Sequence, residues 1–143
     1  MSKSLSSEFE EEDHPSDALL RIRATGMRAL FAAAARATFA LMTDLDRVEL
    51  RTARPIACAA PNREELLAVW LNELIGAASA EALFFREFDI THISDTAIEA
   101  TARGEAIDTK RHALHKEVKA ATYHRLSIRD IAGAWEATVL LDL

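Results

Sequence analysis

Residues 104–124 read GEAIDTKRHALHKEVKAATYH, and this stretch carries more titratable groups between two apolar runs than an ordinary core segment needs. Two acids, Glu105 and Asp108, precede an Arg-His pair at 111–112, and the strand-like run EVKAATYH follows. Side chains alternate between the two faces of a strand. The predicted faces are Val118, Ala120 and Thr122 on one side and Lys119, Ala121 and Tyr123 on the other. Lys119 is thus expected on a half-buried strand, although composition alone favours a solvated face.

The composition is typical of one globular domain, because half of the 143 residues are hydrophobic and 28% are charged. The net charge of -6 argues against a broad electrostatic surface for nucleic acid, so we expect no direct nucleic-acid binding. The single cysteine, Cys58, excludes an internal disulfide, and its apolar surroundings favour a buried thiol over a nucleophile. The chain has no long apolar run and no signal peptide, which predicts a cytoplasmic protein without membrane contact.

The hydrophobic periodicities predict an α+β fold, in which a mostly antiparallel β-sheet packs against two amphipathic helices in a single domain. Residues 1–12 are polar and acidic and are expected to form a flexible tail, which leaves 13–143 as the domain. Asn62 and Glu65 have the spacing of a capping box, and Pro55 indicates an edge strand or a bulge. The expected helices are 27–42 and 63–78, and the expected strands are 19–24, 47–59, 84–92, 97–103, 117–124 and a hairpin turning at 132–133.

The last two residues bring two carboxylates close together, because the side chain of Asp142 lies next to the main-chain carboxylate of Leu143. Two anionic groups this close are costly unless they are solvated or neutralised by a cation. Carboxylate oxygens suit a hard divalent cation such as Ca²⁺, Mg²⁺ or Mn²⁺, and Asp17, which precedes the first strand, is a further carboxylate. The sequence alone does not place Asp17 beside Asp142.

No catalytic signature is present. The chain has no G-x-S-x-G turn, no glycine-rich phosphate loop, no H-E-x-x-H and no pair of cysteines. His112 and His115 are expected in a loop, where solvation explains them as well as ligation does. No catalytic residue is therefore predicted, and the chain is not expected to be an enzyme.

The sequence resembles the archease family, whose members carry G-E-x-x-D-x-x-x-H followed by E-V-K-A-x-T-Y-H. Gly104, Glu105, Asp108 and His112 match the first motif, and residues 117–124 match the second. The resemblance extends over about 13–143 through ALMTD at 40–44, WLNEL at 70–74 and the C-terminal LLDL. Residues 13–17 read DHPSD where the family has D-H-T-A-D, so Pro15 and Ser16 depart from its pattern.

The resemblance implies a divalent cation held by Asp17, Asp142 and Leu143. It also implies an accessory protein that activates a GTP-dependent RtcB-type RNA ligase, as in tRNA splicing and RNA repair, by assisting guanylylation and repeated turnover. GTP then concerns the chain only through that ligase. The residues expected to face the partner or to support its function are Lys119, His14, Glu105, His112, Tyr123 and His124.

Two other functions stay open at this point. A metal-dependent hydrolase would use the same carboxylates with Lys119 and His124. A chaperone-like interaction module would need no specific chemistry, and its function would depend on apolar surface instead of the carboxylates.

Overall fold

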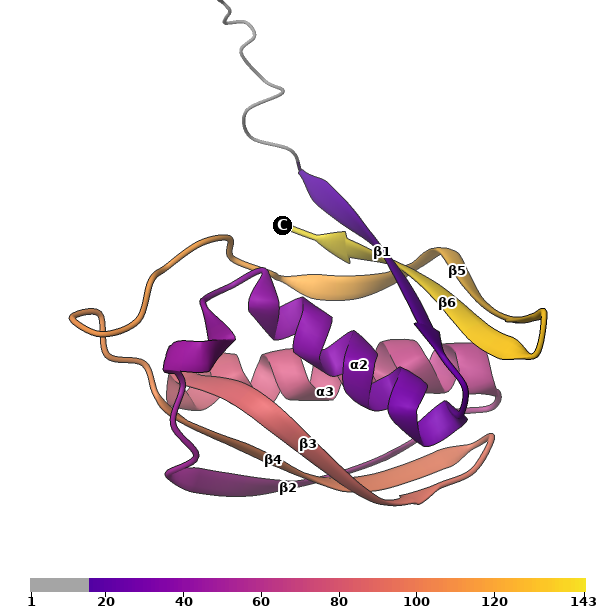
Figure 1. Cartoon of the computed structure of the whole chain (residues 1–143), viewed down its shortest axis with the longest axis horizontal. Coiled ribbons are helices and arrows are strands. Elements are labelled where there is room, and N and C mark those ends of the chain that lie inside the picture. Colours follow the sequence, from indigo (N-terminus) through magenta and orange to yellow (C-terminus); the bar gives the residue numbers. More distant parts are fainter. Residues whose placement is uncertain (1–15) are drawn as a thin grey trace, which may run out of the picture.

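The computed structural model describes residues 16–143, so the expected tail at 1–12 and His14 lie outside the described residues. Six strands and two α-helices follow one another along this part of the chain (Figure 1). They are β1 (Asp17–Ala24), α2 (Met27–Ala40), the 3-10 helix η2 (Leu45–Arg47), β2 (Thr52–Ala59), α3 (Arg63–Glu81), β3 (Leu83–Ile93), β4 (Ala97–Ala106), β5 (Ala120–Ile131) and β6 (Ala134–Asp142). Among residues 16–143, no helix combines the length and the apolar character that crossing a membrane requires.

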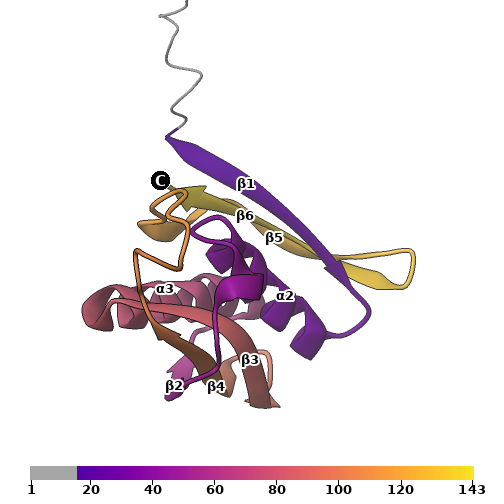
Figure 2. The same cartoon turned by 60° about the vertical axis from the view of Figure 1, so that its left-hand side comes forward.

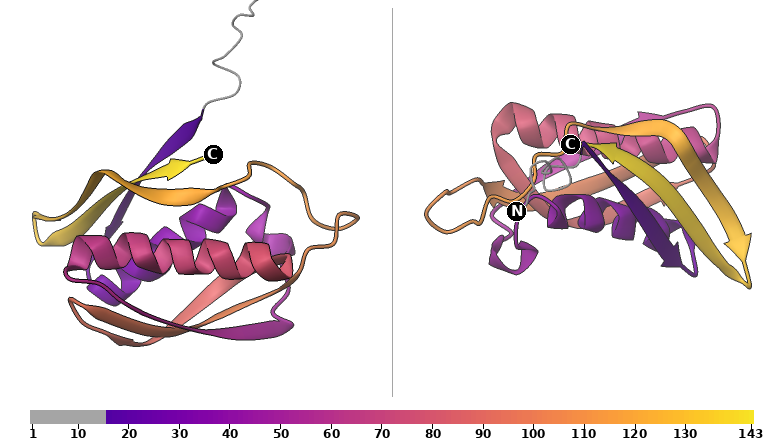
Figure 3. Two further views of the ribbon diagram at one scale, coloured as in Figure 1. Left: turned by 180° about the vertical axis from the view of Figure 1, so that it is seen from behind. Right: turned by 90° about the horizontal axis from the view of Figure 1, so that it is seen from above.

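The strands form two antiparallel sheets with the orders β1-β6-β5 and β2-β4-β3. Figures 1 and 2 show the two helices lying between these sheets, so that the domain has a sheet, a helix layer and a second sheet. The view from above in Figure 3 shows β1, β6 and β5 side by side over the helices. The predicted α+β class is confirmed, but the strands are divided between two sheets where a single sheet was expected.

The helix layer supplies most of the largest fully buried side chains and packs against both sheets. Helix α2 buries Leu30, Phe31 and Phe39, and its alanines Ala34 and Ala35 allow close approach of the neighbouring elements. Helix α3 contributes leucines and a tryptophan to the same cluster of buried side chains. The indole N–H of that residue, Trp70, donates to the main-chain oxygen of Phe31 at 3.0 Å. This bond joins the two helices and satisfies the one polar atom of a fully buried side chain.

The expected cap of α3 is present, because the Asn62 side chain accepts a hydrogen bond from the backbone N–H of Glu65 at 2.9 Å. Helix α3 ends three residues later than predicted, where Ala82 adopts a left-handed conformation with φ of 54°. Pro55 lies in β2, which is an edge strand. This agrees with the prediction from the sequence, because proline has no N–H to donate to a neighbouring strand.

Two strand predictions were wrong at their starts. The strand expected from 47 begins at Thr52, because the chain forms the 3-10 helix η2 at 45–47 first. The strand expected from 117 begins at Ala120, and Val118 and Ala121 are both buried. The simple alternation fails there because Val118 precedes the regular pairing of β5, so the expected face shared by Lys119 and Ala121 does not exist.

Gly104 determines how closely β3 and β4 can approach. A Cβ atom at this position would lie 1.8 Å from the carbonyl oxygen of Phe84, which belongs to the neighbouring strand and cannot move independently. The close approach explains why glycine begins the motif that organises residues 104–124. Its own carbonyl oxygen accepts from the backbone N–H of Arg51 at 2.9 Å, which holds the segment before β2 against β4.

We predict that Gly104→Ala lowers the free energy of unfolding by at least about 3 kcal/mol, because the methyl group forces β3 and β4 apart. Chemical denaturation followed by circular dichroism measures the loss. Gly76→Ala is the matched control, since Gly76 lies within α3 and a Cβ there meets nothing within 4 Å. The control is expected to gain about 0.5–1 kcal/mol from helix propensity. Equal stability of the two variants would contradict the close-approach explanation.

Candidate functional site

Asp17 and Asp142 lie directly opposite each other at the end of the sheet β1-β6-β5. The backbone N–H of Leu143 donates to the oxygen of Ser16 at 2.9 Å, so residues 16 and 143 form a hydrogen-bonded pair. Since such pairs alternate along an antiparallel ladder, Asp17 and Asp142 form a non-hydrogen-bonded pair, the type whose side chains come closest. We call Asp17, Asp142 and Leu143 the carboxylate tip.

The charges of the carboxylate tip are not balanced within the fold. Both aspartates are exposed, and within residues 16–143 neither carboxylate has a hydrogen-bond or ion-pair partner. Like charges directly opposite each other in a sheet are destabilising. Two adjacent carboxylates that solvent can reach therefore fit a hard divalent cation. The described residues contain no group of three His, Cys, Asp or Glu side chains suited to a metal.

Lys119 lies beside the carboxylate tip. Its backbone N–H donates to the carbonyl oxygen of Asp142 at 2.8 Å, and its side chain is exposed. The next residue, Ala120, is the register partner of Asp142 in β5. The structure therefore brings together Asp17, Asp142, Leu143 and Lys119 from three segments of the chain.

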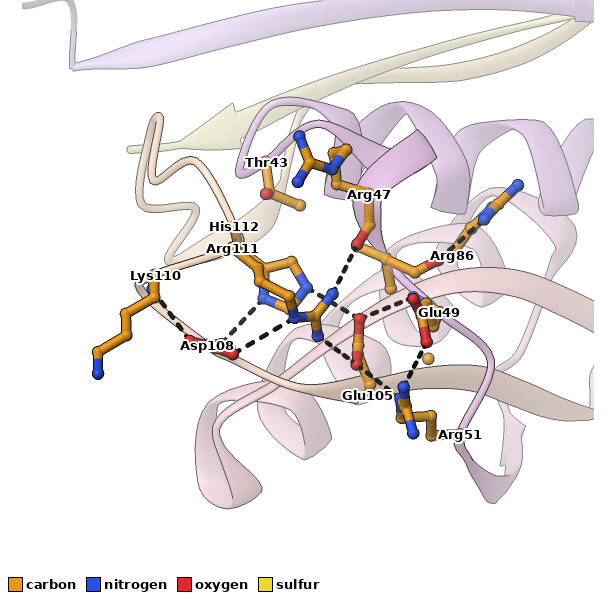
Figure 4. Close-up of polar contacts among 12 residues, drawn as sticks. Thr43, Arg47, Glu49, Arg51, Arg86, Glu105, Asp108, Lys110, Arg111 and His112 are labelled. Carbon is orange, nitrogen blue, oxygen red and sulfur yellow. Dashed lines mark hydrogen bonds and ion pairs between the residues drawn. The ribbon is translucent and has the colours of Figure 1, made fainter.

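A second group of charged side chains surrounds Glu105, which is only 3% exposed (Figure 4). Its Oε1 accepts from Arg111 Nη2 at 2.7 Å and lies 3.4 Å from Arg51 Nε. Its Oε2 accepts from the backbone N–H of Glu49 at 2.8 Å and lies 2.9 Å from His112 Nε2. We call these contacts the Glu105 network. Both oxygens of a buried carboxylate are therefore used, as burial of a charge requires.

His112 is held in one orientation by the same network. Its Nδ1 accepts a hydrogen bond from the backbone N–H of Asp108 at 2.9 Å, so the proton of a neutral ring lies on Nε2 and is donated to Glu105. The ring meets Phe84 edge to face, with centroids 5.5 Å apart. The side chain is fully buried and has partners at both nitrogens, which accounts for a histidine inside the fold without a bound metal.

The network changes the acidity of Glu105. Burial by itself raises the pKa of the carboxyl, but hydrogen bonds from Glu49, Arg111 and His112 and the charge of Arg111 outweigh burial and lower the pKa from 4.5 to about 2. The bond to Glu105 also raises the pKa of the Arg111 guanidinium. Glu105 is therefore ionised at neutral pH and holds neighbouring donors in place.

The Glu105 network anchors the start of the segment 107–119, which connects β4 to β5 and leads to Lys119. Backbone N–H groups of His115 and Lys116 donate to the oxygens of Met42 and Leu41. The hydroxyl of Thr43 donates to the oxygen of Ala113 at 2.7 Å. A chain of contacts thus runs from the buried Glu105 to the exposed carboxylate tip, and Figure 1 shows this segment passing the end of α2 on its way to β5.

Comparison with known proteins identifies the family. The model of the archease protein family matches residues 9–143. The chain belongs to the archease family. Curated archeases from Methanopyrus kandleri and Methanosarcina barkeri are 35% and 33% identical to it, over 94% and 95% of this chain and 99% and 96% of theirs.

Solved structures agree with the observed fold. Protein 1598 of Methanobacterium thermoautotrophicum is 33% identical, covers 90% of this chain and 94% of its own, and superposes with a TM-score of 0.76. A Thermotoga maritima protein described as an archease and possible chaperone has a TM-score of 0.62 at 18% identity, over 100% of this chain and 98% of its own. The latter similarity concerns the fold alone.

The archease motif EVKAATYH does not act as one strand. Tyr123 and His124 are both exposed, because the pairing of β5 with β6 shifts between Thr122 and Ser127 and leaves the intervening residues without regular partners. Arg125 has a positive φ of 61° within this bulge. Tyr123 is 59% exposed. By contrast, Glu105 and His112 of the other archease motif are buried, so they reach a partner only through the segment that they hold.

An apolar groove of about 380 Å³ lies between the end of α3, the start of β3 and the segment 107–118. Its lining includes Ile75, Leu83, Phe84 and Val118. Leu114 at its rim is 60% exposed, which is unusual for a leucine. None of the residues of the carboxylate tip lines this groove.

Sequence reasoning missed the role of Asn72, which lies within the archease motif WLNEL. Its side-chain amide donates to the oxygen of Ala121 at 3.0 Å and accepts from the N–H of the same residue at 2.7 Å. These two bonds tie β5 to α3 next to the carboxylate tip. The sequence feature that could have indicated this role is an amide side chain among the apolar residues of a core helix, because a buried polar group needs a hydrogen-bond partner. Cys58 was expected to be a buried thiol, but it is only partly buried; burial followed by the charge of Glu73 raises the pKa of the thiol to about 11.

We predict that Glu105→Gln lowers the free energy of unfolding at pH 7 by about 3 kcal/mol, because it removes the charge that Arg111 and Arg51 pair with inside the fold. The folded-state pKa of Glu105 lies below its ordinary value, so its contribution is complete above pH 4.5 and is lost as the pH falls toward about 2. The stability difference between wild type and variant should therefore shrink over that range in urea titrations. Glu99→Gln on the exposed side of β4 is the control. A difference that persists at pH 2 would contradict the ionised state assigned to Glu105.

Proposed function

We propose that this archease is an accessory protein that activates a GTP-dependent RtcB-type RNA ligase and is not itself an enzyme. The observation that carries the proposal is the pairing of Asp17 with Asp142 in a family member, where neither carboxylate has a charge partner within residues 16–143. The tip presents this negative charge at an exposed sheet end, where a partner protein can reach it. Family membership supports the ligase as that partner, and GTP enters only through the ligase.

The residues of the carboxylate tip fit a divalent cation, Ca²⁺, Mg²⁺ or Mn²⁺. Asp17 and Asp142 would hold it with their side chains, and Leu143 would add its main-chain carboxylate. When bound, such a cation supplies positive charge for phosphate oxygens or for the metal chemistry of the ligase. The side chains of the chain itself keep two roles: the aspartates retain the ion, and Lys119 offers a single cation to an acidic or phosphate group of the partner.

The charge of the protein agrees with contact to a protein and not to RNA. A net charge of -6 repels a polyanion but complements a basic, metal-rich cleft. Association would be steered by this charge and weakened by salt. The cytoplasmic location expected from the sequence is part of the same proposal, because it is where an RNA ligase would meet this partner.

The apolar groove favours a second candidate function. The Thermotoga maritima relative is described as a possible chaperone, and an exposed leucine at the edge of an apolar hollow is suited to binding unfolded chain segments. A chaperone of this kind would depend on Leu114 and not on Asp142. The two functions therefore differ in the residue whose loss abolishes them.

Multiple-turnover RNA ligation by the cognate ligase tests the main proposal. We predict that the wild-type chain increases turnover, and that Asp17→Ala and Asp142→Ala each reduce this stimulation at least tenfold, about 1.4 kcal/mol, because the tip no longer retains its cation. Asp130→Ala is the matched control, since Asp130 is also an exposed aspartate of the same sheet. The control should stimulate as wild type does.

Other outcomes distinguish the alternatives. Equal stimulation by Asp142→Ala and wild type would keep the ligase as partner and discard the role of the carboxylate tip. Loss of function only in Leu114→Asp would favour the chaperone. Hydrolysis of phosphoesters by the purified protein alone would favour a metal-dependent hydrolase. Calorimetric titration with Ca²⁺, Mg²⁺ and Mn²⁺ gives a readout independent of ligation, in which the Asp142→Ala variant should lose binding and Asp130→Ala should not.

A further inference from the structure

Each sheet has two edge strands, and three of the four edges are interrupted. The register of β5 shifts between Thr122 and Ser127, and β3 shifts twice along its pairing with β4. Strand β2 contains Pro55, which cannot donate a hydrogen bond. Bulges and prolines of this kind protect sheet edges from pairing with another chain. Strand β1 has neither, and it pairs with β6 without a register shift from Asp17 to Ala24.

The free hydrogen-bonding groups of β1 can be assigned from its pairing with β6. The bond from Leu143 to Ser16 means that the even-numbered residues from 16 to 24 face β6. The N–H and C=O groups of the odd-numbered residues therefore point to the open edge, away from β6. These residues are Asp17, Leu19, Arg21 and Arg23. Within residues 16–143, no other segment pairs with this edge.

We propose that β1 pairs antiparallel with β1 of a second copy of this chain, with Leu20 opposite the partner's Leu20. The two three-stranded sheets would then form one six-stranded sheet with the order β5-β6-β1 followed by the partner's β1-β6-β5. In this register every free N–H and C=O from residue 17 to residue 23 finds a partner. The proposal goes beyond the ligase function and does not depend on it.

The side chains of β1 are self-complementary in this register. Asp17 lies opposite the partner's Arg23, and the two-fold axis repeats the pair at the other end of the strand. On the inner face, Leu20 meets the partner's Leu20, and Ala18 meets the partner's Ile22. These residues are half-buried in the single chain, so pairing completes their burial. Opposite charges and apolar pairs across adjacent strands each stabilise a sheet.

Other registers are less favourable. Centring the pairing on residue 21 places Arg21 opposite the partner's Arg21, and like charges in that position repel. Sliding one β1 strand by a single residue along the other would turn its apolar side chains to the outer face of the sheet. Centring the pairing on Leu19 also places Asp17 opposite an arginine, Arg21, but it leaves Arg23 without an opposite residue in β1. The register centred on Leu20 is therefore favoured, because it pairs all four odd-numbered residues of β1 with residues of the partner's β1. A strand from an unrelated protein would have to reproduce the same alternation.

The dimer should be weak and concentration-dependent. Two paired eight-residue strands bury less area than the roughly 1,200 Å² of standard stable interfaces. The ionic pairs lie on the outer, exposed face, so salt should weaken the association. Arg23 also has a distant contact with Glu136 at 3.8 Å in the single chain, and its side chain stays 56% exposed. It is therefore free to turn toward a partner.

Sedimentation equilibrium of the full chain, from about 1 μM to about 1 mM, tests the proposal at the concentrations where a weak dimer dissociates. The mass should rise from 15.8 kDa to twice that value.

Arg23→Asp and Asp17→Arg should each raise the dissociation constant at least tenfold. The double variant Asp17→Arg/Arg23→Asp restores opposite charges across the axis and should recover most of the affinity. Leu19→Pro removes an N–H from the open edge without removing a bond to β6, and it should abolish the dimer while leaving the circular dichroism spectrum unchanged.

Arg129→Asp is the matched control, because Arg129 is an exposed arginine of β5 that also lies near Glu136, at 3.7 Å. It should leave the dissociation constant unchanged. A wild-type chain that remains monomeric at every concentration would overturn the proposal. A dimer that is equally weakened by Arg23→Asp and Arg129→Asp, or one that the double variant does not restore, would overturn it as well.

Discussion

The helix layer between two sheets is the constraint on which the rest of this structure depends. Each helix has to bury side chains on two sides, so a single apolar stripe is not sufficient. Helix α2 meets the requirement with small residues and aromatic rings, and α3 with leucines, Trp70 and alanines. Polar atoms inside this layer must find partners there, which is why Trp70 bonds to the backbone of α2 and Asn72 to that of β5.

The acidic side chains of the Glu105 network and of the carboxylate tip lie in opposite environments. Glu105 is buried, and an arginine, a histidine and a backbone N–H bind its carboxylate. These contacts hold the start of the segment 107–119 in place. Asp17 and Asp142 are exposed and face each other, and within residues 16–143 nothing neutralises them. The Glu105 network stabilises the fold. The repulsion between Asp17 and Asp142 at the carboxylate tip destabilises it, and a bound cation would relieve that repulsion. The segment 107–119 connects the network and the tip physically.

Much of this could be predicted from the sequence, and the failures have identifiable physical causes. Periodicity found both helices and the alternating faces of β4 and β6, because those elements are regular and bury one side. It failed at Lys119 and Ala121, because the entry into β5 and the bulge after Thr122 break the alternation. Periodicity does not encode which strands share a sheet, so the division into two sheets was not foreseen.

For the candidate site, Asp142 and Leu143 were adjacent in sequence, but only a family resemblance suggested Asp17, since its contact with Asp142 is long-range. The roles of Asn72 and Arg51 depend on tertiary contacts that no local pattern reveals.

The pairing of β1 with β6 joins residues 125 positions apart, and this separation affects how the protein folds. Closing so long a loop costs conformational entropy before any contact compensates for it, so proteins with many such contacts fold slowly. Sheet β2-β4-β3, by contrast, is assembled from residues 52–106, so its pairings close shorter loops. We therefore expect the aspartates at the ends of β1 and β6 to be among the last groups to meet. Their meeting marks a chain that has finished folding, so a cation or partner that requires both aspartates selects native molecules over incomplete ones.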